Sequence, residues 1–395
     1  MESRFRYTYR MPNIQAPPLF QLALTFTPGL GPVRSRRLIA HLGSAAAIFE
    51  AAQSDIEQVE GVGSAVARGI IKNRDNALSL ANKELRKAEN LGVRVVSQDQ
   101  PGFPQLLRPL PDCPLVLFIR GELDPEDQFS LGVVGSRRCS QYGLEHSERF
   151  ANRLASRGIR IVSGGARGID TAAHRGALNA GGRTIVVLGC GLSHCYPPEN
   201  LALFDSIVDG GGAIVSELPC DAPPEGRNFP ARNRIISGMS LGVLVVEAGR
   251  KSGALITARQ AVEEHGREVF ALPGRVDSGA CAGSLDLLKM GGAQLVTEPS
   301  DIVHALEMPA RHAHAGTHSD RYAPDEANRY EPATRANVPG GESGQRVYEA
   351  CRESRTLDQI GEVTGLDMAA IGQAVTLLEI SGLVTRSGGQ VTASR

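Results

Sequence analysis

Residues 132–170 contain two short apolar runs, each of which ends in small residues and an arginine and is followed by a helical pattern. The first run ends in Gly135-Ser136-Arg137, and the second ends in Ser163-Gly164-Gly165-Ala166-Arg167. Glycine lets the backbone approach a phosphate, the following helix points N–H groups at it, and arginine supplies the countercharge. The stretch therefore predicts a βαβ unit whose strand ends accept an anionic ligand.

The alternation of short apolar runs and helical patterns continues to residue 297. These runs are rich in β-branched residues and show little polar alternation, as expected where helices cover both faces of a parallel sheet. Strands are expected at 92–96, 131–134, 161–162, 184–188, 213–216, 242–246, 268–271 and 294–297. Residues 97–120, rich in proline, are expected to form turns. The pattern predicts an α/β fold, an extended Rossmann-like doubly wound parallel sheet with ligand sites at the carboxyl ends of its strands.

Several loops at these strand ends share a composition of small and basic residues. The segment 228–234 opens a helix with two more arginines, and the loop after residue 246 contains a lysine and a serine. Several such loops on one sheet edge form a phosphate-binding surface, and a surface this long suits a polymer better than a mononucleotide. The candidate binding residues are Gly135, Ser136, Arg137, Ser163, Gly164, Gly165, Arg167, Arg232, Asn233, Arg234, Lys251 and Ser252.

Charge is unevenly distributed along the chain. The formal net charge is −1, yet residues 131–183 contain nine arginines and only three acidic residues. Such an excess indicates an anionic partner. Two interpretations remain open for Arg149, Arg153 and Arg157. They could contact the anionic partner, or, because they are spaced four residues apart, they could form a solvated helix face. Arg137 and Arg167 lie in glycine turns, where ligand contact is the better explanation.

Residues 1–90 are predicted to form an all-α helix–hairpin–helix (SAM-like) module. Gly29-Leu30-Gly31 and Gly61-Val62-Gly63 are two copies of a Gly-apolar-Gly turn, each followed by a helical pattern. Turns of this kind bring backbone amides to a DNA phosphate without reading sequence, but they also serve as plain packing modules. The sequence leaves both roles open.

A core, a linker and a C-terminal domain complete the predicted organisation. The Rossmann-like core spans residues 91–307. Residues 308–344 have the composition of a disordered linker, and their histidines reflect that composition rather than a metal site. Residues 345–395 predict a winged helix with a recognition helix from Asp367. No lysine or arginine occurs from Asp367 to Gly382, so contact with protein is as good an interpretation as contact with DNA.

Composition limits the remaining function classes. No run approaches 18 consecutive apolar residues, so we expect no membrane span. Seven scattered cysteines without a CxxC pair indicate reduced thiols in a cytoplasmic protein rather than a disulfide framework or a zinc site. We expect no cofactor and no metal.

With these residues in hand, the chain resembles the DNA-processing protein A family (DprA, also called Smf) along nearly its whole length. The resemblance implies a bacterial protein that binds single-stranded DNA, loads the RecA recombinase onto it during natural transformation, and forms a homodimer through its Rossmann-like cores. It assigns DNA contact to Arg137, Arg167, Arg232 and Arg234. The matching motifs are Val134–Arg137, Ser163–Asp170 with Ala173 and His174, Gly189–Gly191, Tyr196-Pro197, Ser216-Glu217, Phe229–Ile236, Glu247-Ala248, Ser252–Thr257 and Pro273-Gly274.

The alternative is an enzyme, a nucleotide-processing Rossmann hydrolase of the lysine-decarboxylase-like class. Such enzymes use a carboxylate at a strand end, and Glu217 and Glu247 occupy such positions. Neither lies in the glycine-rich PGGxGT-type signature of that class. A P-loop and a GxGxxG fingerprint are also absent, and no Ser/His/Asp set has suitable spacing. We therefore predict no catalytic residues and a binding protein rather than an enzyme.

Overall fold

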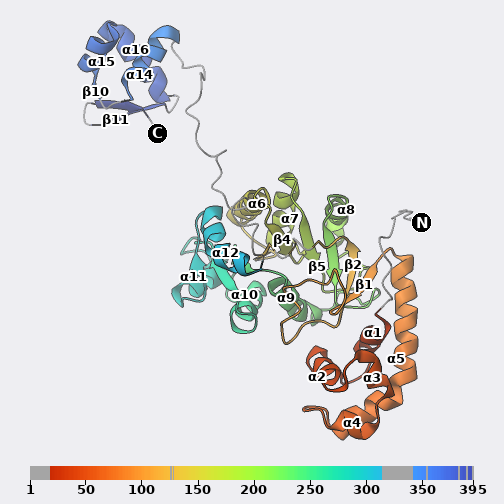
Figure 1. Cartoon of the computed structure of the whole chain (residues 1–395). Helices are drawn as coiled ribbons and strands as arrows, with labels where there is room; N and C mark the ends of the chain where they lie inside the picture. Colours follow the sequence, from red (N-terminus) through yellow and green to blue (C-terminus); the bar gives the residue numbers. More distant parts are fainter. Residues whose placement is uncertain are drawn as a thin grey trace. The chain divides into compact units, whose positions relative to one another are not determined.

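The structure is a computed structural model that describes residues 18–124, 127, 129–313, 341–352, 355–380, 383–387 and 390–393. It divides into two compact units, Met1–Tyr322 and Ala323–Arg395. The first contains the N-terminal helices and the central sheet, and the second contains the C-terminal helices and a small sheet (Figure 1).

A nine-stranded sheet in the order β1-β2-β6-β5-β4-β3-β7-β8-β9 forms the centre of the first unit. Seven of its strands, from β6 to β9 in this order, pair in parallel and confirm the predicted doubly wound arrangement. The strands are β1 (Arg94–Ser97), β2 (Val116–Gly121), β3 (Ser130–Val134), β4 (Arg160–Ser163), β5 (Thr184–Val187), β6 (Ala213–Ser216), β7 (Gly242–Val245), β8 (Glu268–Ala271) and β9 (Gln294–Leu295).

Strand β2 corrects the expectation of turns up to residue 120. It pairs antiparallel with both β1 and β6, which extends the parallel sheet by two strands. Its residues 116–119 are buried. The prolines that suggested turns lie before the strand, at positions 101–114, where they leave its ladder of hydrogen bonds intact.

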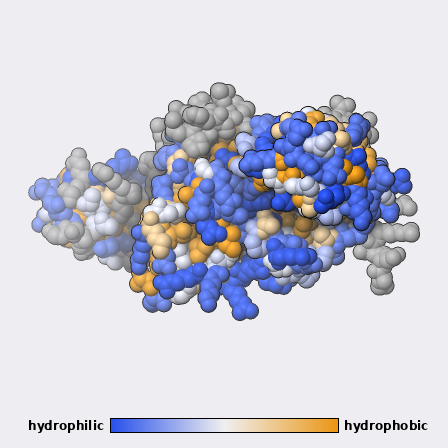
Figure 2. Space-filling view, turned by 90° about the horizontal axis from the view of Figure 1, so that it is seen from below, coloured by the Kyte–Doolittle hydropathy of each residue, from blue (hydrophilic) through white to orange (hydrophobic). Residues whose placement is uncertain are grey.

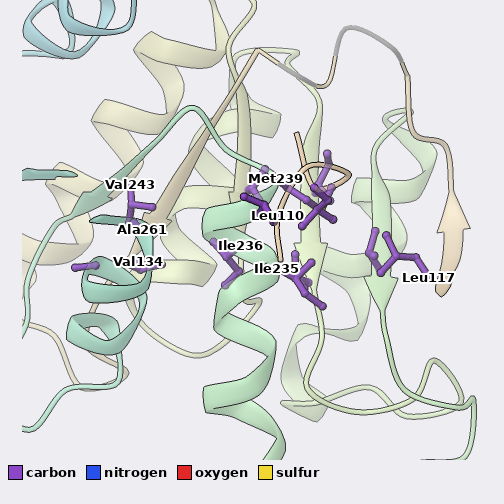
Figure 3. Close-up of a cluster of buried hydrophobic side chains, with 14 of the residues drawn as sticks. Leu110, Leu117, Val134, Ile235, Ile236, Met239, Val243 and Ala261 are labelled. Atoms are coloured by element: carbon purple, nitrogen blue, oxygen red, sulfur yellow. The ribbon is translucent and has the colours of Figure 1, made fainter. Parts of the chain in front are cut away.

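Helices cover both faces of the sheet, so neighbouring residues of one strand enter different cores. Val134 packs with Ile235 and Ile236 of α9 in one core, shown in Figure 3. Val133 packs with Phe150 of α6 in the other core. The helices of this region are α6 (Gln141–Ala155), α7 (Ile169–Asn179), the short 3₁₀ helix η2 (Pro198–Asn200), α8 (Leu201–Asp209), α9 (Asn228–Gly238), α10 (Ala254–Glu263), α11 (Ala282–Lys289) and α12 (Pro299–Ala313).

The N-terminal helices share a core with the edge of the sheet. Val116 and Phe118 of β2 belong to the same buried cluster as residues of the N-terminal helices. The two Gly-apolar-Gly turns precede α2 and α5, as their helical patterns predicted. These helices are α1 (Leu19–Thr25), α2 (Pro32–Leu42), α3 (Ala45–Glu50), α4 (Gln53–Glu57) and α5 (Ser64–Asn90).

The second unit has the three helices and the β-hairpin expected of a winged helix. Its small sheet has the order β10-β12-β11. Its elements are α14 (Gly341–Ala350), β10 (Arg355–Thr356), α15 (Leu357–Thr364), α16 (Met368–Ile380), β11 (Val384–Ser387) and β12 (Gln390–Ala393). Helix α12 extends to Ala313 and α14 begins at Gly341, so the predicted linker 308–344 is helical at both ends, and residues 314–340 lie outside the described residues.

Among the described helices, none combines the length and the apolar character needed to cross a membrane. The face of the molecule in Figure 2 carries small groups of hydrophobic residues within a largely hydrophilic surface.

Candidate nucleic-acid interface

A pocket of about 510 Å³ opens at the carboxyl ends of β3 and β7. Its walls are the loop between β3 and α6, the first turn of α9 and the loop that leads into α10. The structure thus brings together residues that lie more than 100 positions apart in the sequence. The predicted residues that line the pocket are Gly135, Ser136, Arg137, Arg232, Asn233, Lys251 and Ser252.

Gly135 fixes the course of the loop after β3. A Cβ atom at this position would lie 2.5 Å from Ile169 Cγ1 and 2.9 Å from the carbonyl oxygen of Glu247. Such contacts are too close for any side chain, so only glycine fits. The next residue, Ser136, donates its backbone N–H to the same Glu247 carbonyl at 2.7 Å. This contact anchors the loop to the end of β7.

The side chain of Glu247 anchors the far end of that loop. Its fully buried carboxylate accepts the backbone N–H of Ser140 at 2.9 Å and also the Ser140 hydroxyl. Ser140 in turn accepts the N–H of Gly143 at 3.2 Å and caps α6. Glu247 is therefore engaged by the loop that carries Arg137 and Arg138.

Three cations stand exposed around the pocket. The guanidinium of Arg137 lies 4.8 Å from the centre of the Phe229 ring, a distance at which a cation–π contact orients it. Arg138 and Lys251 are also exposed and line the pocket. Within the described ranges, no carboxylate forms an ion pair with any of the three. They are free to meet an anion from solution.

Arg232 forms the buried cationic floor of the pocket. Its guanidinium donates to the carbonyl of Gly164 at 2.7 Å and to the carbonyl of Val187, while its Nε atom has no partner within the described part of the chain. Burial lowers the pKa of Arg232 to about 10, and the neighbouring Asp170 opposes that shift. The group is still protonated at neutral pH, so it adds positive charge beneath the exposed cations.

Asp170 is a buried acid in this basic pocket. Its carboxylate accepts the N–H of Ala166 at 3.3 Å and thereby closes the turn after β4. Burial raises the pKa of Asp170 to about 6, although Arg232 and Arg137 favour its charged form. The charge of the pocket therefore changes near pH 6.

Three predicted residues at the start of the turn after β4 support the pocket, and Ala166 further along the turn lines it. The hydroxyl of Ser163 is buried and donates to the carbonyl of Val133 at 2.6 Å, which joins β4 to β3. Gly164 lies against the Arg232 guanidinium, and Gly165 adopts a φ of 65° beside Val186 and Phe204. A side chain at either glycine would displace these neighbours. These three predicted residues therefore shape the site from behind.

Two predicted arginines have carboxylate partners. Exposed Arg167 donates to both oxygens of Glu199, with 3.0 Å between its Nη2 and Glu199 Oε2. Arg234 is mostly buried, and it donates to both oxygens of Glu217 at 2.6 Å. An incoming phosphate would have to displace Glu199 to reach Arg167. The structure does not bring Arg234 to the pocket.

Phe229, Asp170 and Thr257 also line the pocket, although they belong to matching motifs without being among the candidate binding residues. Phe229 belongs to the segment 228–234, so the aromatic residue beside its arginines was an available signal. Asp170 and Thr257 gave no such signal. An acidic residue within a basic stretch and a threonine within an apolar helix both occur without any role in binding.

Two further sets of ionisable side chains lie outside the pocket. The Nδ1 atom of His174 lies 2.7 Å from the Thr184 hydroxyl, and burial lowers the pKa of this histidine to about 3. Within the described residues, Asp112, Glu264 and His265 form the one group that could hold a metal ion. Arg234 Nε lies 3.7 Å from the Asp112 carboxylate, and its positive charge disfavours a cation there.

Known proteins confirm the family that the motifs suggested. Residues 94–307 match the family described as DNA recombination-mediator protein A, and residues 331–390 match the DprA winged helix domain. Protein Smf of Escherichia coli (strain K12) is 41% identical over 311 residues, which are 75% of this chain and 83% of that protein. Protein Smf of Synechocystis is 35% identical over 94% of this chain and 97% of that protein.

A solved structure agrees in fold. The X-ray structure of DNA processing protein A from Streptococcus pneumoniae superposes with a TM-score of 0.62 at 35% identity, over 72% of this chain and 97% of that one. A Rossmann-like core that matches the recombination-mediator model and a C-terminal winged helix that matches the DprA winged helix model define the class of this chain. The chain belongs to the DNA recombination-mediator protein A (DprA) family.

Proposed function

We propose that the pocket binds single-stranded DNA through its phosphates. The observation that carries the proposal is the set of exposed cations, Arg137, Arg138 and Lys251, which have no carboxylate partner in the described part of the chain and surround a floor of buried Arg232. Backbone phosphates need such charge-assisted contacts, and these contacts do not read base sequence.

The aromatic ring in the pocket favours a single strand over a duplex. Phe229 is half-buried, and its ring centre lies 4.8 Å from the Arg137 guanidinium and 5.6 Å from the centre of the Tyr196 ring. Bases of a single strand are free to stack on such a ring, whereas bases of a duplex are stacked on each other. Phosphate contact and base stacking together describe a site for single strands of any sequence.

A salt titration tests the proposal directly. Fluorescence anisotropy with single-stranded oligonucleotides of different sequence should give similar affinities that fall steeply with salt. For single strands, log K should change by about 0.7 per log unit of salt for each phosphate contact. Strong sequence preference, or equal affinity for single-stranded and duplex DNA, would contradict the proposal.

We further propose that the protein loads RecA onto the bound strand in natural transformation, and that it acts in the cytoplasm as a homodimer. Membership of a family of recombination mediators supports the first of these. The seven cysteines are free, which suits a reducing compartment. The exposed β9 at the edge of the sheet, with Leu295 53% exposed, supports self-association.

We propose that the protein binds single-stranded DNA and does not hydrolyse nucleotides. The two strand-end carboxylates that an enzyme of the alternative class would need are occupied by the chain itself, Glu217 by Arg234 and Glu247 by Ser140. A nucleotide-hydrolysis assay run beside the binding titration should give no turnover.

A further inference from the structure

Helix α6 carries four side chains of related chemistry on one face. At 3.6 residues per turn, Tyr142, His146, Arg149 and Arg153 lie within about 60° of one another around the helix and span about 17 Å along it. Tyr142, Arg149 and Arg153 are exposed, and His146 is half-buried. We call these four residues the α6 stripe.

The aromatic end of the α6 stripe is held in place. The Tyr142 hydroxyl donates to the carbonyl of Pro273 at 2.7 Å, and the Tyr142 and His146 ring centres are 4.0 Å apart. Partial burial and the nearby Arg149 lower the pKa of His146, which keeps its ring neutral at neutral pH. Because the exposed Tyr142 ring and the half-buried His146 ring are already held in place, stacking of a flat ligand on them costs little side-chain entropy.

The basic end of the α6 stripe is free to meet an anion. The Nη2 atom of Arg149 lies 3.1 Å from His146 Nδ1, and its guanidinium lies 5.7 Å from the centre of the Phe150 ring. Neither Arg149 nor Arg153 forms an ion pair within the described ranges of the chain. Glu145 lies at the border of the stripe and is engaged by the Gln141 side chain at 2.8 Å.

The α6 stripe is continuous with the pocket. Arg138 lines the pocket and stands four residues before Tyr142, and the loop between them is pinned by Glu247 through Ser140. Tyr142 contacts Pro273, which follows β8, so the aromatic end lies at the same carboxyl edge of the sheet as the pocket. Aromatic rings followed by arginines along one surface supply both the stacking and the charge that single strands need.

We propose that the α6 stripe is a second segment of the DNA site, where a single strand that leaves the pocket past Arg138 stacks bases on Tyr142 and His146 and places phosphates against Arg149 and Arg153. This inference rests on the proposed function of the pocket. It also assigns a role to arginines that the sequence alone leaves between ligand contact and a solvated helix face. The partner is single-stranded DNA of any sequence, long enough to extend beyond the pocket.

Strand length separates the two segments in an experiment. An oligonucleotide of about 4 nucleotides should fill the pocket alone, and one of about 16 should reach the α6 stripe as well. Tyr142→Ala should weaken binding of the long strand about five-fold or more and leave the short strand unchanged. Arg149→Ala should act likewise and lower the salt slope for the long strand by about 0.7. Arg86→Ala, which removes an exposed arginine from α5, should change neither length.

A spectroscopic readout reports the stacking itself. The chain contains no tryptophan, so Tyr142→Trp introduces a single tryptophan, whose fluorescence is separable from that of the tyrosines, into the stripe. We expect the long strand to quench its fluorescence and the short strand to leave it unchanged. If the long strand binds, as anisotropy reports, without quenching, the α6 stripe is not a stacking site.

The pocket variant distinguishes the two proposals. Arg137→Ala should weaken binding of both lengths. If it does so while Tyr142→Ala and Arg149→Ala change neither length, the α6 stripe proposal is wrong and the pocket proposal stands. If Arg137→Ala changes neither length, the pocket proposal fails and the stripe proposal fails with it.

Discussion

The Nη2 atom of Arg234 lies 2.6 Å from each of the two carboxylate oxygens of Glu217. Glu217 follows β6 and Arg234 lies within α9, so this ion pair ties one end of the sheet to the helix that forms the pocket floor. Burial raises the pKa of Glu217, and Arg234 opposes that shift by favouring the charged carboxylate. The pair is thus a structural element of the site, although the sequence presents its arginine as a candidate DNA contact.

We predict that Arg234→Ala lowers the free energy of unfolding. Removing one partner of a buried ion pair leaves the other charge uncompensated, which costs about 3–5 kcal/mol of unfolding free energy. The double variant Arg234→Met with Glu217→Leu should cost less than the single change, because it removes both charges. Urea denaturation followed by circular dichroism measures both. An Arg234→Ala protein that keeps its stability but loses DNA affinity would show that Arg234 contacts DNA.

Arg137→Ala is predicted to lower the affinity for single-stranded DNA and to leave the stability unchanged. Arg137 is exposed and its loop is shaped by Gly135 and Glu247, so the fold should survive the change. Loss of one charge-assisted phosphate contact should weaken single-strand binding by about 1–3 kcal/mol. Anisotropy titration with a short oligonucleotide measures this, and Arg86→Ala is the matched control. Equal losses in both variants would mean that binding depends on general charge rather than on the pocket.

Glu199 is predicted to compete with DNA for Arg167. The two side chains form an exposed ion pair, which a phosphate has to replace before it gains a contact. Arg167→Ala should therefore cost less affinity than Arg137→Ala. Conversely, Glu199→Gln should release Arg167 and tighten single-strand binding at low salt. Weaker binding by Glu199→Gln would show that the pair shapes the site rather than occupying it.

Short-range patterns in the sequence were enough to predict the parallel sheet and the loops at its strand ends. Buried parallel strands have sequences of consecutive β-branched residues. A close approach between backbone segments requires glycine, as at Gly135. The prediction failed for β2, because its prolines precede the strand and its pairing with β6 joins residues almost 100 positions apart. Local patterns do not contain such pairings.

The same limit explains the arginines. Arg137 follows a glycine turn and Arg234 lies in the helix-opening segment 228–234, and the sequence presents both as candidate DNA contacts. What separates them is a carboxylate brought beside one of them by the fold, since Glu217 lies 17 positions from Arg234 across a loop and a helix turn. Burial and partner choice are tertiary properties, so the sequence defined the candidates but could not divide them into ligand contacts and structural ion pairs.

The homodimer predicted from the family resemblance has a specific surface to be tested. Val276, Met290 and Leu295 are 91%, 83% and 53% exposed, and Leu295 belongs to the edge strand β9. Light scattering should give about twice the chain mass of 42.0 kDa. Leu295→Glu with Met290→Glu should halve that mass and leave binding of short oligonucleotides intact. A wild-type mass of one chain at all micromolar concentrations would contradict the dimer.

A pH dependence of binding is predicted from Asp170. Its pKa is raised from 3.8 to about 6 by burial, so the carboxylate gains a proton as the pH falls through about 6. Protonation removes one negative charge from a pocket that binds an anion, and single-strand affinity should therefore increase as the pH is lowered from 7.5 to 5.5. Stability should change in the same direction: the folded state holds this proton more tightly than the unfolded state, so the unfolding free energy should fall as the pH rises from about 4 to 6.

Asp170→Asn tests whether this carboxylate causes the pH dependence. The amide keeps an oxygen that can accept the Ala166 N–H, so the turn after β4 should retain its shape. Because the variant is neutral at every pH, it should bind single strands more tightly than the wild type at pH 7.5 and equally well at pH 5.5. Its affinity should no longer depend on the charge of residue 170. If the variant keeps the full pH dependence of the wild type, another group titrates at the site and Asp170 remains charged throughout this range.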